Sequence, residues 1–104
     1  MRITVCGSGA GWVTASRANS CYLLDDGERG LLLDCGPGSL LGIARSGLPF
    51  PSASALVVSH LHMDHIQGLG FFQPLFKPGA RIDIWGPPSA TRHLRERLGR
   101  YLSP

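Results

Sequence analysis

Ser59-His60-Leu61-His62-Met63-Asp64-His65 continues a short apolar, β-branched run, Ala55 to Ser59, that predicts a buried strand. The stretch contains three of the four histidines of the chain, together with one carboxylate. Imidazole nitrogen and carboxylate oxygen are the ligands that zinc and similar divalent cations prefer. Because His60 and His62 are two positions apart, an extended backbone directs both imidazoles to the same side. The stretch therefore predicts a metal site where a strand ends.

The residues after the paired histidines predict the start of a helix, loosened by Gly68 and Gly70. Four candidate ligands then share one strand-to-helix loop. We expect one ion on His60 and His62, and a second ion about 3.5–4 Å away on Asp64 and His65, as in two-metal hydrolases. Zinc is the expected ion, and manganese and iron are alternatives that accept the same ligands. A histidine-rich surface loop without metal is the competing interpretation.

The pattern His-x-His-x-Asp-His after a strand resembles the metallo-β-lactamase superfamily. Other stretches resemble the same superfamily. Residues 1–9 resemble its opening strand and glycine turn, and 17–24 and 31–38 resemble its next two strands with their Asp-x-Gly turn. Residues 82–88 resemble a strand that ends in Gly-Pro. The last of these is similar to the ribonuclease Z and phosphodiesterase branch. The resemblance implies that this chain forms the amino-terminal half of an αββα sandwich.

We expect an α/β (α+β) fold in which residues 1–104 form a single partial domain, with one mixed sheet and helices on one face. Strands are predicted at 3–6, 20–24, 30–34, 55–59 and 81–85, a hairpin turn at 25–27, and helices at 39–46 and about 89–102. Ser39 and Ser89 are predicted to cap the two helices. Leu94, Leu98 and Leu102 are predicted to form the buried stripe of the last helix.

The resemblance implies a metal-dependent hydrolase, and the Gly86-Pro87 turn favours phosphodiester hydrolysis of the ribonuclease Z kind by a metal-activated water. Asp64 would accept the proton of the attacking water as a general base. Asp34, at the end of a strand, has two interpretations of equal weight. It orients a ligand histidine, or it caps the turn at 35–38. Other esters, thioesters and lactams stay open as substrates.

In the resembled superfamily, further histidine and aspartate ligands lie well downstream of this loop, and His93 does not match them. One expectation is that two chains associate as a homodimer in which each completes the half-fold. The alternative is a truncated, catalytically incomplete metal-binding remnant. Whether the chain is an enzyme therefore stays open from sequence alone.

The basic residues of the last third suggest a second function for that region. Arg92, Arg95 and Arg100 are candidate contacts to the phosphates of RNA or another nucleic acid, and a solvated helix face is the more common explanation. The net charge of +3 is compatible with a polyanionic substrate without requiring one.

Two further features place the chain in a cellular context. No apolar run is long enough to span a membrane, and the opening residues are too short for a signal-peptide core, which predicts a cytoplasmic protein. The cysteines are scattered, without a Cys-x-x-Cys pair, and are predicted to be reduced, buried thiols: Cys6, Cys21 and Cys35.

Overall fold

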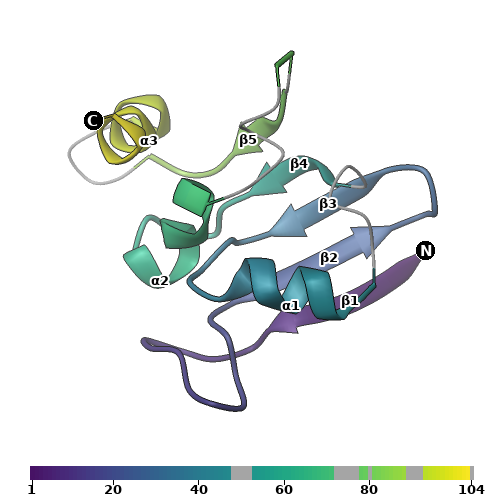
Figure 1. Ribbon diagram of the computed structural model, residues 1–104. Helices are drawn as coiled ribbons and strands as arrows, with labels where there is room; N and C mark the ends of the chain where they lie inside the picture. The colour runs from purple at the N-terminus through teal and green to yellow at the C-terminus, as the bar shows by residue number, and fades with distance from the viewer. Residues whose placement is uncertain (48–52, 72–77, 80, 89–92, 104) are drawn as a thin grey trace.

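The computed structural model describes residues 1–47, 53–71, 78–79, 81–88 and 93–103. Within these residues one five-stranded sheet has the order β1-β2-β3-β4-β5 (Figure 1). The strands are β1 (Arg2–Gly7), β2 (Cys21–Asp25), β3 (Gly30–Leu33), β4 (Ala53–Val57) and β5 (Asp83–Trp85). The helices are α1 (Ser39–Arg45), α2 (Met63–Ile66) and α3 (Leu94–Leu102), and a 3₁₀-helix, η2 (Gln67–Phe71), follows α2 directly.

The sheet is mixed, as predicted. β1, β2 and β3 are antiparallel neighbours, whereas β3, β4 and β5 run parallel. The predicted hairpin joins β2 and β3: Asp26 Oδ1 accepts the backbone N–H groups of Glu28 and Arg29 at 3.0 and 2.8 Å. Gly27 has a left-handed φ of 94°, which glycine adopts without steric cost. Parallel strands need a crossover, and α1 lies in the connection between β3 and β4.

The helices cover one face of the sheet only (Figure 1). Side chains alternate along each strand, so one set meets the helices and the other set points away from them. The helix-covered face forms the core, in which strand residues pack against residues of α1, α2, η2 and α3: Leu23, Leu32, Leu56, Ile43, Ile66, Leu69 and Leu98. On the opposite face, Ile3, Val5 and Trp85 are 64%, 60% and 66% exposed. In the described part of the chain nothing covers that face, so the expected arrangement of helices is confirmed.

The predicted start of α1 is right, but its predicted cap is wrong. The N-cap residue is Gly38, with a left-handed φ of 79°, and Ser39 is the first helical residue. The Ser39 hydroxyl donates instead to the carbonyl oxygen of Gly36. That hydroxyl therefore holds the turn before the helix together and leaves the N-terminal N–H groups of the helix uncapped by a side chain.

The last helix is shorter than predicted. It begins at Leu94, because His93 has an extended backbone with ψ of 155° that a helix cannot run through. Ser89, its predicted cap, lies outside the described residues. Leu98 is buried as predicted, whereas Leu102 is 46% exposed, and Tyr101 packs against the core in its place. No helix among the described residues has both the length and the apolar character needed to cross a bilayer.

Candidate metal centre

The loop after β4 directs its two paired histidines away from the core. Val58 keeps the chain extended, since its N–H donates to the Trp85 carbonyl oxygen at 2.7 Å. Leu61 lies between the histidines and is buried. In extended backbone the residues on either side of a buried side chain point outward together. His62 is still extended, and α2 begins at the next residue. The predicted alternation of His60 and His62 about a buried neighbour is therefore present.

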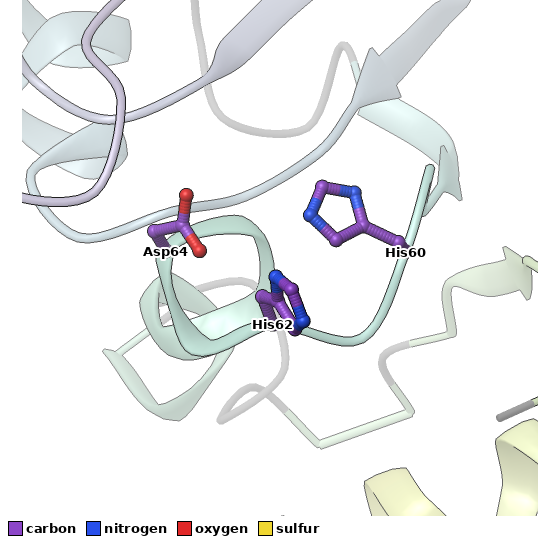
Figure 2. A group of neighbouring side chains, drawn as sticks. All are labelled: His60, His62 and Asp64. Atoms are coloured by element: carbon purple, nitrogen blue, oxygen red, sulfur yellow. The ribbon is translucent and has the colours of Figure 1, made fainter. Parts of the chain in front are cut away.

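Asp64 joins these two histidines from the first turn of α2. One ligand atom each from His60, His62 and Asp64 lie within 4.8 Å of one another (Figure 2). The ring centroids of His60 and His62 are 4.7 Å apart, with the planes nearly perpendicular. Two imidazoles and a carboxylate are a donor set that zinc accepts. The structure thus groups three of the four predicted ligands, and their chemistry fits the implied cation.

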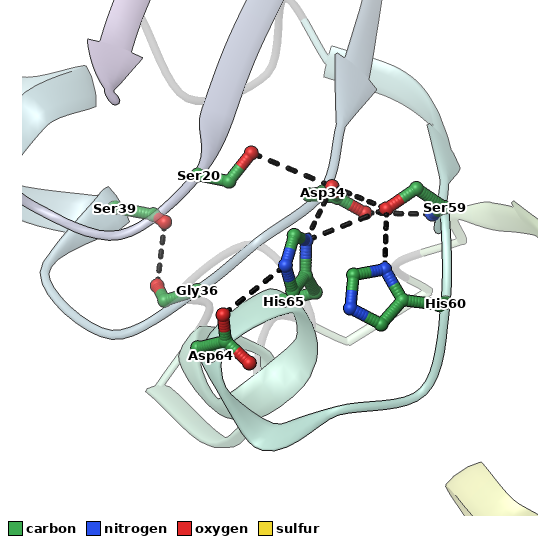
Figure 3. A network of polar contacts seen from close by, with 8 residues as sticks. All are labelled: Ser20, Asp34, Gly36, Ser39, Ser59, His60, Asp64 and His65. Atoms are coloured by element: carbon green, nitrogen blue, oxygen red, sulfur yellow. Dashed lines mark hydrogen bonds and ion pairs between the residues drawn. The ribbon is translucent and has the colours of Figure 1, made fainter. Parts of the chain in front are cut away.

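His65 lies against the same group (Figure 3). Its ring centroid is 3.8 Å from that of His60, and its Nε2 atom is 3.1 Å from Asp64 Oδ2. Its Nδ1 atom is 2.6 Å from Asp34 Oδ2. A neutral imidazole that donates from Nδ1 presents the lone pair of Nε2 to the Asp64 carboxylate. His65 Nε2 and Asp64 Oδ2 are then two electron-pair donors that face each other, and they are well placed to bind one cation together. The division of the four donors between two ions stays a prediction.

The carboxylate of Asp34 is buried, and it has several partners that offset the cost of burial (Figure 3). Its Oδ1 atom accepts the Ser59 N–H at 2.7 Å, and its Oδ2 atom accepts the Ser59 hydroxyl at 2.7 Å. The hydroxyl of Ser20 lies 3.4 Å from the same Oδ2 atom. The contact to His65 that the orienting interpretation requires is therefore present. Asp34 acts on a metal ligand only if His65 is one, and that part stays a prediction.

Ser59 and Ser20 are site residues that the sequence did not reveal. Because the single hydroxyl proton of Ser59 is directed to Asp34, its oxygen accepts from His60 Nδ1, which lies 3.1 Å away. His60, like His65, then presents Nε2 outward. The only sequence signal for Ser59 is its place directly before the first histidine. β4 has the predicted length but spans Ala53–Val57, so it begins and ends two residues before the predicted 55–59. Ser59 lies outside the strand, and its N–H bonds to the Asp34 carboxylate and not to a neighbouring strand.

The loop is fastened to the turn after β3 by backbone contacts that require glycine. Cys35 N–H donates to His65 O, and Gly68 N–H donates to Cys35 O, both at 2.8 Å. A Cβ atom on Gly36 would lie 2.0 Å from the carbonyl oxygen of Asp64. The backbone of Asp64 and His65 is therefore held against residues 35–36, which fixes the direction in which both side chains leave it.

The candidate nucleic-acid contacts lie elsewhere. Arg95 and Arg100 are exposed on α3, and Arg100 Nη2 is 3.6 Å from Glu96 Oε1. Arg92 lies outside the described residues. His93 is exposed at the N-cap of α3 and is not part of the grouped donors. Phosphate binding by this helix stays a prediction.

Comparison with solved structures defines the class of the fold. The crystal structure of human tRNase Z, short form, superimposes with a TM-score of 0.81 at 27% identity, covering 98% of this chain and 39% of that chain. The metallo-β-lactamase fold protein YhfI from Bacillus subtilis superimposes with a TM-score of 0.76 at 28% identity, covering 98% and 41%. The protein therefore has the metallo-β-lactamase fold, and the predicted fold class is confirmed.

Sequence comparison gives the family. A family model described as Anti-Pycsar protein Apyc1 matches residues 1–101, and the chain belongs to that family. Ribonuclease Z of Haloferax volcanii is 43% identical over 100 residues, which cover 92% of this chain and 31% of that protein. The chain spans about a third of the length of the curated relatives it matches. The predicted likeness to ribonuclease Z is thus confirmed over that part of the fold.

Proposed function

We propose that this protein is a metal-dependent phosphodiester hydrolase of the ribonuclease Z kind, and that His60, His62, Asp64 and His65 bind its metal. The observation that carries the proposal is the convergence of three donor atoms from one strand-to-helix loop to within 4.8 Å of one another. Nitrogen and oxygen donors this close together can share one divalent cation. Zinc is the proposed ion.

The residues of this chain have distinct tasks in that reaction. His60 and His62, which flank the buried Leu61 in the sequence, offer two nitrogen ligands. His65 is held by Asp34 so that its Nε2 atom faces Asp64. When bound, a divalent cation supplies charge neutralisation for phosphate oxygens and lowers the pKa of water. The Asp64 carboxylate is partly exposed, with its Oδ2 atom beside His65, and it is our candidate for accepting the proton of the attacking water.

Two observations support a phosphodiester as the substrate. Ribonuclease Z from Haloferax volcanii and the short form of human tRNase Z are similar to this chain over nearly all of its length. The chain also carries a net charge of +3, with Arg95, Arg97 and Arg100 exposed on α3, which favours an anionic polymer. An RNA phosphodiester is therefore the proposed substrate, and α3 is the proposed contact with its backbone.

Hydrolysis of bis(4-nitrophenyl) phosphate with added zinc or manganese tests this proposal. We expect turnover that a chelator abolishes, that His62→Ala lowers by at least about 100-fold, and that His93→Ala leaves unchanged. An RNA oligonucleotide, assayed in parallel, reports cleavage of a polymer, and a cyclic mononucleotide reports opening of a cyclic phosphodiester. Turnover that is equal in the two histidine variants would contradict the assignment of the site.

A metal-binding domain without turnover is the second candidate. It is favoured by the fact that the described residues hold one group of metal-binding donors, all from a single loop. The chain covers 31% of the length of ribonuclease Z from Haloferax volcanii, so the comparison supports this loop and not a complete two-metal site. Zinc binding with no hydrolysis of any phosphodiester, thioester or lactam substrate would support this candidate over the first.

A further inference from the structure

Cys6 and Cys21 lie side by side where β1 and β2 pair. The register between these strands shifts after Val5, so that Gly7 pairs with Cys21 and Cys6 occupies a bulge next to it. A bulge sets two residues of one strand against one residue of its partner. Both cysteines belong to the core on the helix-covered face, with 6% and 0% exposure. Neither is in a disulfide. Two thiols from neighbouring strands therefore share one side of the sheet.

The three thiols of the core differ in chemical character. The hydrogen bond between Cys21 and Cys6 lowers the pKa of Cys6, because the Cys21 thiol donates to the Cys6 sulfur. The same contact, together with burial, raises the pKa of Cys21. Burial raises the pKa of Cys35 to about 12. Since the thiolate is the reactive form, this contact favours Cys6 as the nucleophile of the pair and Cys21 as the neighbour that holds a proton.

Cys6 also borders a cavity on the helix-covered side of β1. This cavity has a volume of about 390 Å³ and lies between β1, the loop at 13–18 and α1. Among the residues that the structure describes, Cys21, Cys35 and the carboxylates do not line this cavity. Its charged lining residues are Arg17 and Arg45. The cavity lies on the α1 side of β1, away from the candidate metal loop.

We propose that Cys6 and Cys21 are a redox-active dithiol pair, in which Cys6 reacts with a peroxide through this cavity and Cys21 then closes an intramolecular disulfide. In the first step the Cys6 thiolate attacks one oxygen of hydrogen peroxide; an S–O bond forms, the O–O bond breaks, and hydroxide leaves. In the second step the Cys21 sulfur attacks the Cys6 sulfur; the S–S bond forms and the S–O bond breaks. The hydroxide of the first step takes up the proton that Cys6 lost on ionising, and the hydroxide of the second step takes the Cys21 proton. Two thiols and one peroxide therefore give one disulfide and two waters.

The arginines of the chain make this pairing simple to map. Tryptic cleavage after Arg2, Arg17, Arg29 and Arg45 places the three cysteines on separate peptides, 3–17, 18–29 and 30–45. The native 104-residue chain is treated with hydrogen peroxide in the presence of a chelator, free thiols are blocked, and the digest is analysed by mass spectrometry. We expect peptide 3–17 to be linked to 18–29, in at least about tenfold excess over any pair that contains 30–45.

Controls keep the outcome decisive. Circular dichroism during the treatment shows whether the fold is intact. The same oxidation in guanidinium chloride gives the disulfides of the unfolded chain, in which the preference for the link between 3–17 and 18–29 should disappear. Cys35→Ser should leave the product unchanged, and Cys6→Ser should abolish it. A dominant link to peptide 30–45, a disulfide between chains, or three intact thiols in a folded protein would each overturn the proposal. The mapping of the unsubstituted chain decides the matter even if a variant does not fold.

Discussion

Asp34 and His65 are 31 positions apart in the sequence, and Nδ1 of His65 lies 2.6 Å from Oδ2 of Asp34. This contact fixes which ring nitrogen faces Asp64. Asp34→Asn keeps the size of the side chain and tolerates the left-handed φ of 61° at this position, but it removes the negative charge. We expect zinc affinity to fall by about 10–100-fold, measured by calorimetric titration. Asp26→Asn, an exposed carboxylate in the β2–β3 hairpin, is the control. Equal affinities in the two variants would contradict the role of Asp34.

Gly36→Ala tests how the loop is held. The added Cβ would lie 2.0 Å from the Asp64 carbonyl oxygen, and backbone cannot rotate out of the way as a side chain can. We expect a loss of about 1–3 kcal/mol in the free energy of unfolding, together with weaker zinc binding. Gly99→Ala is the matched control, because an added Cβ there meets nothing within 4 Å. In the interior of α3 that substitution should be neutral or stabilising. A harmless Gly36→Ala would show that the loop is free to move.

The ion pair at the edge of the sheet predicts a pH dependence of stability. Arg2 donates from Nε and Nη2 to the Asp25 carboxylate, both at 3.0 Å, and these hydrogen bonds hold the pKa of Asp25 below its ordinary value. A lowered pKa in the folded state stabilises the protein above the unfolded-state pKa, about 3.9. That contribution is lost as the pH falls through the folded-state pKa.

Asp25→Asn should therefore reduce the urea midpoint at about pH 6 and reduce it less as the pH falls below about 4. Asp83→Asn, in an exposed pair with Arg81 whose atoms are 3.2 Å apart, is the control and should have a smaller effect at every pH. If Asp25→Asn lowered the urea midpoint equally at about pH 6 and below about pH 4, the charge of Asp25 would not be what stabilises the fold.

The open face of the sheet supports the proposal that two copies associate. Ile3 and Val5 on β1 and Trp85 on β5 are well exposed on this face, at its two edges. Large apolar side chains exposed on a sheet face favour association. We expect the 104-residue chain to sediment as a dimer at micromolar concentration, and Val5→Glu to shift it to monomer. Leu41→Glu, at an exposed apolar position of α1 on the other side of the sheet, should leave the dimer intact. A monomer at these concentrations would contradict the proposal.

Local patterns predicted the elements because the relevant interactions are local. The alternation about Leu61 placed His60 and His62 on one side, and the Asp-Gly turn at 26–27 gave the β2–β3 hairpin. What the sequence could not show depends on contacts between distant segments. Ser59 becomes part of the site only because the turn after β3 brings Asp34 beside it.

The incorrect predictions have the same origin. Ser39 has the side chain of an N-cap, but the left-handed backbone of Gly38 starts the helix one residue earlier, and the hydroxyl finds the Gly36 carbonyl oxygen instead. The sequence at 89–93 contains no residue that forbids a helix, yet the backbone of His93 is extended. The Cys6–Cys21 pair was invisible for a related reason, since a bulge in the β1–β2 register sets which residues face each other.

Metal binding by the loop at 60–65 is tested by the metal content of the folded protein. The chain is dialysed against zinc, freed of unbound ion, and its zinc per chain is measured by mass spectrometry of the element alongside His62→Ala and His93→Ala. We expect bound zinc in the unsubstituted chain and in His93→Ala, and its loss in His62→Ala while circular dichroism shows that the fold is retained. Zinc that is absent from the unsubstituted folded chain, or that persists undiminished in His62→Ala, would contradict metal binding by this loop.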